Sequence, residues 1–189
     1  MTSEVDVHRV RASVFAREVE WRLAGDRLLW EDVTPGGDAS RGIFALDQVE
    51  SVRLTREPMR GGARHFCRLR TRDGATAFIG SLHYAGVLRG EDRSATYRRL
   101  VRALVSRVAS DNPRARFLSG ATPYVWWSVV LGLAALFGAM GALFMLAGRE
   151  MFTTRLALGL ALLALGAPNL FRWLMSNRPG TFDPADPPI

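Results

Sequence analysis

The sequence of 189 residues contains no lysine, and all 25 of its basic residues are arginine. Because this bias extends over the whole chain, we attribute it to a GC-rich genome rather than to phosphate recognition by arginine forks. Cys67 is the single cysteine, which excludes an intramolecular disulfide framework. The three histidines are scattered, and no Cys/His cluster has metal-ligand spacing. We therefore expect neither a metal site nor a disulfide-stapled fold.

Recognisable catalytic motifs are also missing. The sequence has no HExxH, GxSxG or Walker-type loop, and its glycine pairs lack the lysine or the strand–helix context of a phosphate loop. Cys67 falls in a predicted strand, where a buried structural thiol is commoner than a nucleophile. The first ten residues contain Glu4 and Asp6 and no apolar run, so no secretory signal peptide is expected. We expect no catalytic residues and no cofactor.

Charged residues are absent from Tyr124 to Ala147, a run that exceeds the ~20 apolar residues needed to cross a bilayer. A second, less clean apolar run begins at Phe152, after the short connection Gly148–Met151. The sequence therefore predicts two antiparallel transmembrane helices, residues 124–147 and 152–174. Small residues recur every fourth position at Ala134, Gly138 and Ala142, which favours close packing, either within the pair or in a homo-oligomer.

Arginines next to the two predicted spans indicate their orientation. Four lie on the side of the termini and two on the connecting side: Arg114, Arg116, Arg172 and Arg178 against Arg149 and Arg155. This distribution predicts that both termini are cytoplasmic. Aromatic residues at the same interface are predicted membrane anchors: Tyr124, Trp126, Trp127 and Trp173.

Residues 1–118 are predicted to form a small cytosolic α+β domain. Short alternating runs around Gly25-Asp26 predict a hairpin, and further strands are expected over residues 43–46, 49–54, 65–71 and 76–79, with a turn at Asp73-Gly74. The pattern then changes to one apolar stripe of a helix: Tyr97, Leu100, Val101, Leu104, Val105 and Val108. Ser94 is its expected N-cap, and Asn112-Pro113 is expected to end it.

The segment Ala45–Leu54, ALDQVESVRL, followed by the helix Thr96–Ala109, resembles the bacterial pleckstrin-homology-like (bPH) domains, many of which are joined to membrane helices. This resemblance covers roughly half of the chain and transfers no ligand residues. It implies a small antiparallel PH-like sheet or partial barrel with one C-terminal amphipathic helix, followed here by the predicted two-helix transmembrane hairpin. It also implies a binding or scaffolding module. Together with the two predicted spans, we expect a multi-pass protein of the bacterial inner membrane. The proline-rich tail 177–189 is predicted to be a disordered cytosolic segment.

Arginine is densest between Arg53 and Arg72, where Glu57 is the single acidic residue. Strand alternation places Phe66, Arg68, Arg70 and Arg72 on one face. Two interpretations stay open for this segment: an ordinary solvated face, or a surface that contacts anionic lipid head groups or an acidic partner. The candidate residues of this surface are Arg56, Arg60, Arg64, Arg68, Arg70 and Arg72.

We interpret the sequence as an integral membrane scaffold or interaction protein that presents its domain at the membrane surface. Anionic lipid and a protein partner are both open, and nucleic acid is not expected because a membrane anchor is predicted. The alternative is a small transport or channel subunit that uses Arg155, Pro168 and Asn169. An enzyme without a recognisable motif is the third interpretation.

Overall fold

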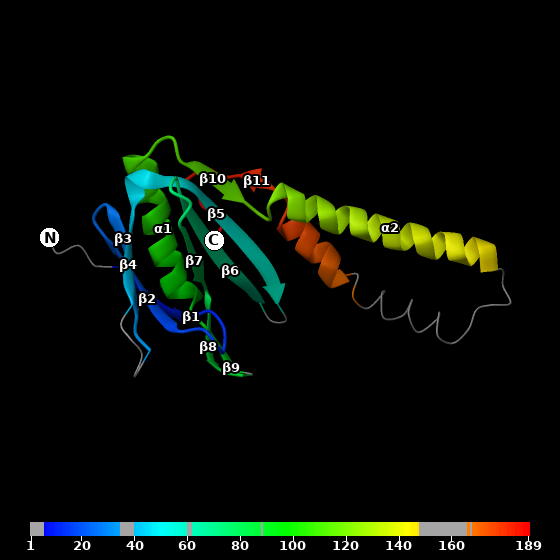
Figure 1. Cartoon of the computed structure of the whole chain (residues 1–189), viewed down its shortest axis with the longest axis horizontal. Coiled ribbons are helices and arrows are strands. Elements are labelled where there is room, and N and C mark those ends of the chain that lie inside the picture. The colour runs from blue at the N-terminus through cyan, green and yellow to red at the C-terminus, as the bar shows by residue number, and fades with distance from the viewer. Residues whose placement is uncertain (1–5, 35–39, 60–61, 88, 148–165, 167) are drawn as a thin grey trace. The chain divides into compact units, whose positions relative to one another are not determined.

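The computed structural model describes residues 6–34, 40–59, 62–87, 89–147, 166 and 168–189 (Figure 1). The chain divides into two compact units. The first, here called the β-rich unit, comprises Met1–Gly120 together with Gly180–Ile189. The second, Ala121–Pro179, is called the inserted unit because the chain leaves the β-rich unit to form it and then returns.

The β-rich unit begins with a four-stranded antiparallel sheet in the order β1-β2-β3-β4. Its strands are β1 (Val7–Arg11), β2 (Glu18–Ala24), β3 (Arg27–Asp32) and β4 (Arg41–Ala45). The predicted hairpin at Gly25-Asp26 is confirmed, since β2 and β3 pair up to Ala24 and Arg27, and Gly25 has the positive φ of +59° that such a tight turn requires. Gly42 is also required, because a Cβ there would lie 2.3 Å from Nε1 of Trp30.

A short 3₁₀ helix, η1 (Leu46–Gln48), leads into a five-stranded sheet in the order β11-β10-β5-β6-β7. Strands β5 (Val49–Met59), β6 (Gly62–Thr71) and β7 (Thr76–Gly80) form an antiparallel meander, and the predicted turn at Asp73-Gly74 joins the last two. Strand β10 (Arg116–Ser119) pairs parallel to β5, and β11 (Gly180–Thr181) pairs antiparallel to β10. Strands β8 (Leu82–Gly86) and β9 (Arg89–Asp92) form a separate ribbon.

Helix α1 (Ser94–Asp111) packs against β1, β2, η1 and β6, as Figure 1 shows for the green helix among the strands. The predicted apolar stripe is confirmed, because its six members from Tyr97 to Val108 are all fully buried. Ser94 is not the N-cap: the Asp92 carboxylate accepts hydrogen bonds from its backbone N–H and its hydroxyl. At the other end, the Asn112 side-chain amide donates to the carbonyl of Val49 at 2.7 Å and fastens the helix to β5.

The C-terminal tail, predicted to be disordered, instead completes the five-stranded sheet. Gly180 pairs with Ser119, and the rings of Phe182 and Phe117 meet edge to face at 5.7 Å between centroids. Phe182 and Ile189 both pack against the core of the β-rich unit. Proline-rich composition indicates that a segment cannot form a helix or a central strand; it does not exclude a two-residue edge strand followed by apolar anchors.

The inserted unit contains α2 (Pro123–Ala147), whose stretch Pro123–Ala142 is long and apolar enough to cross a membrane and is not buried in the protein. A helix over residues 168–176 lies next to its first turns, since the Trp126 indole N–H donates to the Leu174 carbonyl at 3.0 Å. The amide of Ala121 likewise donates to the carbonyl of Asn177 at 2.9 Å.

The predicted fold class is therefore wrong. The described residues form several sheets rather than one antiparallel PH-like sheet, and the largest contains the parallel pair β5–β10. No two-helix transmembrane hairpin is evident in them: α2 is the one candidate span, and residues 168–176 are shorter than the ~20 residues of a crossing. Residues 152–165 and 167 of the predicted second span lie outside the described residues. Apolar composition indicates an apolar environment for a segment, and it does not by itself show that the segment spans a bilayer.

Candidate functional site

The outer face of the five-stranded sheet carries a cluster of guanidinium groups. Strand alternation and register place on this face side chains of β10, β5, β6 and β7 that point away from the buried Val52, Leu54 and Leu69. We call this surface the arginine face and define it by Arg53, Arg64, Arg68, Arg70, Arg116, Phe66 and Phe78.

Aromatic rings hold two of these arginines. Phe66 and Phe78, on the adjacent strands β6 and β7, stack with centroids 5.0 Å apart. The guanidinium of Arg64 lies 5.3 Å from the Phe66 centroid, and that of Arg68 lies 5.9 Å from the Phe78 centroid. A ring orients a guanidinium group without neutralising its charge. The arginines over the two rings therefore keep their positive charge. Phe78 itself is 44% exposed.

The carboxylates of the arginine face lie toward its two ends. Glu50 binds both Arg116 and Arg70, the latter with its Nε 3.3 Å from the carboxylate. At the other end, Nε of Arg64 lies 3.7 Å from the carboxylate of Glu57. Among the described residues, Arg68 at the centre of the face makes no ion pair with a carboxylate, so this guanidinium group keeps its positive charge.

Arg53 occupies this centre. It lies directly opposite Arg68 in the β5–β6 register, and its Nη1 donates to the Gly120 carbonyl at 3.1 Å. Burial lowers the pKa of Arg53 below its usual value, and the charges of Arg68 and Arg116 lower it further. The guanidinium groups of three neighbouring strands thus repel one another at this position.

The six predicted arginines do not share one surface. Arg64, Arg68 and Arg70 belong to the arginine face, whereas Arg56 pairs with His65 in register and so lies on the opposite side of β5. Arg72 follows the end of β6, and its backbone N–H donates to the Gln48 carbonyl. Arg60 lies outside the described residues. Sequence reasoning placed Arg53 in the dense segment but left it out of the candidate set, and it missed Arg116, which reaches the face through strand pairing.

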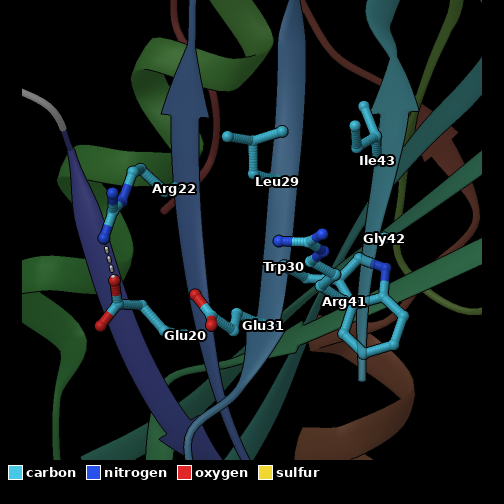
Figure 2. Close-up of a pocket in the computed structure, with 8 residues that line it drawn as sticks. All are labelled: Glu20, Arg22, Leu29, Trp30, Glu31, Arg41, Gly42 and Ile43. Atoms are coloured by element: carbon cyan, nitrogen blue, oxygen red, sulfur yellow. Dashed lines mark hydrogen bonds and ion pairs between the residues drawn. The ribbon is translucent and has the colours of Figure 1, made fainter. Parts of the chain in front are cut away.

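A concave surface lies on the four-stranded sheet (Figure 2), with a cavity of about 570 Å³. Leu29 and Ile43 form its apolar part on neighbouring strands, and Ile43 is 60% exposed. Its buried carboxylate, Glu20, is bound by Arg22 at 2.6 Å and by Arg9, and the hydrogen bond from Arg22 is the main reason that its pKa is lowered. This carboxylate is satisfied by the protein itself, so the surface offers less uncompensated charge than the arginine face.

The three histidines, which are scattered in the sequence, gather near Tyr97 and Ser81. The rings of His8 and His65 lie 6.0 and 6.2 Å from the Tyr97 ring. Nε2 of His8 donates to the Gly80 carbonyl at 2.8 Å, and Nδ1 of His83 accepts from the backbone N–H of Arg11 at 3.1 Å. Burial lowers the pKa of all three, which favours the neutral form of each ring. Within the described part of the chain, no group of three or more His, Cys, Asp and Glu is placed to hold a metal ion.

Cys67 is fully buried on the inner side of β6, and burial raises its pKa to about 12. A thiol with this pKa is protonated at neutral pH and is a poor nucleophile. The prediction that Cys67 is a buried thiol is therefore confirmed.

The four predicted membrane anchors belong to the inserted unit. Tyr124 is 84% exposed and Trp127 is 56% exposed, whereas Trp126 is half-buried by its bond to Leu174. Trp173 is also half-buried, and its carbonyl accepts from the side chain and backbone of Asn177. Of the residues considered for transport, Pro168 and Asn169 are exposed in the helix 168–176, and Arg155 lies outside the described residues.

Comparison with known proteins identifies no relative. No family model matches the chain, and no curated protein or solved structure is significantly similar to it. The resemblance to bPH domains consequently stays a prediction, and the chain is assigned to no family.

Proposed function

We propose that this is a membrane-associated interaction protein whose β-rich unit binds anionic lipid head groups through the arginine face. The observation that carries the proposal is the arrangement of that face: its central guanidinium groups are positioned by aromatic rings and by a backbone carbonyl, while its carboxylates lie toward the ends. Such a surface is oriented but not neutralised, and an anionic layer is its electrostatic complement.

The electrostatic attraction between the arginine face and an anionic leaflet is large enough for weak, reversible binding. Each arginine near an anionic leaflet contributes on the order of 1 kcal/mol, and the attraction decays within a Debye length of about 8 Å at physiological salt. Acting together, the five arginines of the face, partly offset by Glu50 and Glu57, would give an attraction of roughly 3 kcal/mol. Attraction of this size suffices only for a domain that is already held close to a bilayer.

The inserted unit can hold the β-rich unit close to a bilayer. Its α2 has the length and composition of a membrane-crossing helix, and α2 begins at Pro123, four positions after β10 ends at Ser119. A connection this short spans at most roughly 15 Å. Because Gly180 pairs with Ser119, the inserted unit also begins and ends at the same edge of the sheet. A bilayer that holds α2 would therefore keep the β-rich unit close to its surface.

The test is arginine footprinting of the full chain in nanodiscs. The protein is reconstituted in neutral lipid or in lipid with an anionic fraction, treated with phenylglyoxal, and analysed by peptide mass spectrometry. We expect Arg68 and Arg70 to be modified several-fold more slowly in the anionic discs, and high salt to remove the difference. Arg27 and Arg41, exposed on the four-stranded sheet, are the internal controls and should react equally in both.

Two outcomes would count against the proposal. Equal modification of Arg68 in neutral and anionic discs would show that the arginine face is only solvated. Complete release of the chain from membranes by alkaline carbonate would show that α2 does not hold it in the bilayer.

A further inference from the structure

We infer that Arg53 and Arg68, at the centre of the arginine face, together with the neighbouring Arg116, form a binding site for a phosphate monoester group. This inference rests on the proposed function and makes it more specific: it names the chemistry that the face selects among anionic ligands. The three side chains come from three adjacent strands, β5, β6 and β10.

The strand register brings these side chains together. Arg53 is directly opposite Arg68 across β5–β6, and on its other side it is opposite Leu118, with Arg116 two residues away along β10. Side chains directly opposite one another in a sheet have Cβ atoms ~5 Å apart, and like charges in this position are destabilising. The protein nevertheless places a third arginine beside the pair, and Arg68 and Arg116 both act electrostatically on Arg53.

Each of the three guanidinium groups is held by a different contact. Arg53 donates to the Gly120 carbonyl, Arg68 lies over the ring of Phe78, and Arg116 is bound by Glu50. These contacts fix the groups on the outer face of the sheet, so little side-chain freedom remains to be lost on binding.

The chemistry of the cluster favours a monoester over a diester. A phosphate monoester carries close to two negative charges at neutral pH and ends in three acceptor oxygens. A phosphodiester carries one charge and offers two such oxygens between its two substituents. Three guanidinium groups on adjacent strands, two of which act electrostatically on the third, match three oxygens and two charges better, because each fork can bind an oxygen directly.

Two sources share this chemistry: the head group of phosphatidic acid in a membrane, and a soluble phosphate such as inorganic phosphate. The stacked Phe66 and Phe78 beside the cluster would also suit the bases of single-stranded nucleic acid, since bases stack on aromatic side chains. We argue for the monoester because the two rings stack on each other and carry the arginines, which occupies the surfaces that bases would use.

The experiment is isothermal titration calorimetry of the full chain in neutral detergent. The probes are dihexanoyl phosphatidic acid, dihexanoyl phosphatidylglycerol, inorganic phosphate and a uridine dodecamer. We expect phosphatidic acid to bind at least tenfold more tightly than phosphatidylglycerol and to be displaced by inorganic phosphate. Inorganic phosphate as tight as phosphatidic acid would identify a soluble ligand, and weaker binding of inorganic phosphate would identify the lipid.

The variant Arg68→Gln should weaken binding of phosphatidic acid at least tenfold, and Arg68→Lys should weaken it less, since the charge remains and the fork is lost. Arg72→Gln, at the end of the same strand but outside the face, is the matched control and should bind as the parent chain does. Circular dichroism and thermal unfolding check that each variant is folded; Arg68 is exposed, so we expect no change.

The possible failures are distinguishable. Equal affinity for the two lipids would overturn the monoester site and leave the proposed function standing. No binding of either lipid would overturn both. Tighter binding of the uridine dodecamer than of phosphatidic acid, lost in Arg68→Gln, would replace the monoester with nucleic acid as the ligand.

Discussion

The strongest test of the fold is to excise the β-rich unit and to ask whether the C-terminal segment stabilises it. Because Ser119 and Gly180 are paired, the inserted unit can be replaced by a tight turn: residues 1–120, an Asn-Gly linker and residues 180–189. This chain would close the β10–β11 pair with a three-residue hairpin loop. The comparison is with residues 1–120 alone, which lack β11, Phe182 and Ile189.

We call residues 1–120 alone the open chain and the linked version the closed chain. The expected difference in their free energies of unfolding follows from the contacts that the open chain lacks. Full burial of a Phe or Ile side chain is worth about 1.5–3 kcal/mol, and Phe182 and Ile189 are each half-buried against the core. Their combined contribution is therefore about 1–3 kcal/mol. For a domain of this size the corresponding loss of Tm is roughly 3–12 °C.

Urea unfolding followed by tryptophan fluorescence measures the difference. The excised unit contains only Trp21 and Trp30, both in the four-stranded sheet, so the signal reports cooperative unfolding from a distant part of the unit. Phe182→Ala in the closed chain should lose part of the stabilisation. Identical urea midpoints for the open and closed chains would refute the packing argument, and an unfolded closed chain would refute the independence of the unit.

Two further predictions concern the core. Leu104 is fully buried in the centre of α1, so Leu104→Ala should lower the free energy of unfolding by about 2–5 kcal/mol, measured by the same urea titration; exposed Arg102→Ala, on the same helix, should change it little. The three histidines predict a loss of stability in acid: desolvation lowers their pKa values from 6.5 in the fold, so the unfolded chain binds more protons as the pH falls below that value. The urea midpoint should be constant from pH 8 to 7 and decline from 6.5 to 5.5, and a flat profile over that lower window would contradict their burial.

The sequence predicts those elements whose signals are local. The stripe of α1 and the turns at Gly25 and Gly74 depend on residues close together in the chain, and they form as expected. Strand β10 has four residues and β11 has two, too few to show a period, and both depend on pairing with β5, directly or through β10.

In the candidate site, too, only the features that depend on local sequence could be predicted. The density of arginine on β6 predicted a cationic face, because strand alternation is a local property. Its centre could not be predicted, since Arg116 reaches Arg53 only through the parallel register between β10 and β5. The approach of His8 and His65 to Tyr97 depends likewise on contacts between segments far apart in the chain.

The pairing of Ser119 with Gly180 also sets the order of events during synthesis. The strand that completes the sheet is separated from β10 by about 60 residues, which take roughly 3–12 s to translate at ~5–20 residues per second. During this interval the ribosome releases α2 while the edge of β10 still lacks its last neighbour. Helix α2 is therefore exposed to lipid or solvent before β11 is synthesised. The β-rich unit can complete its five-stranded sheet only after the whole inserted unit has left the ribosome.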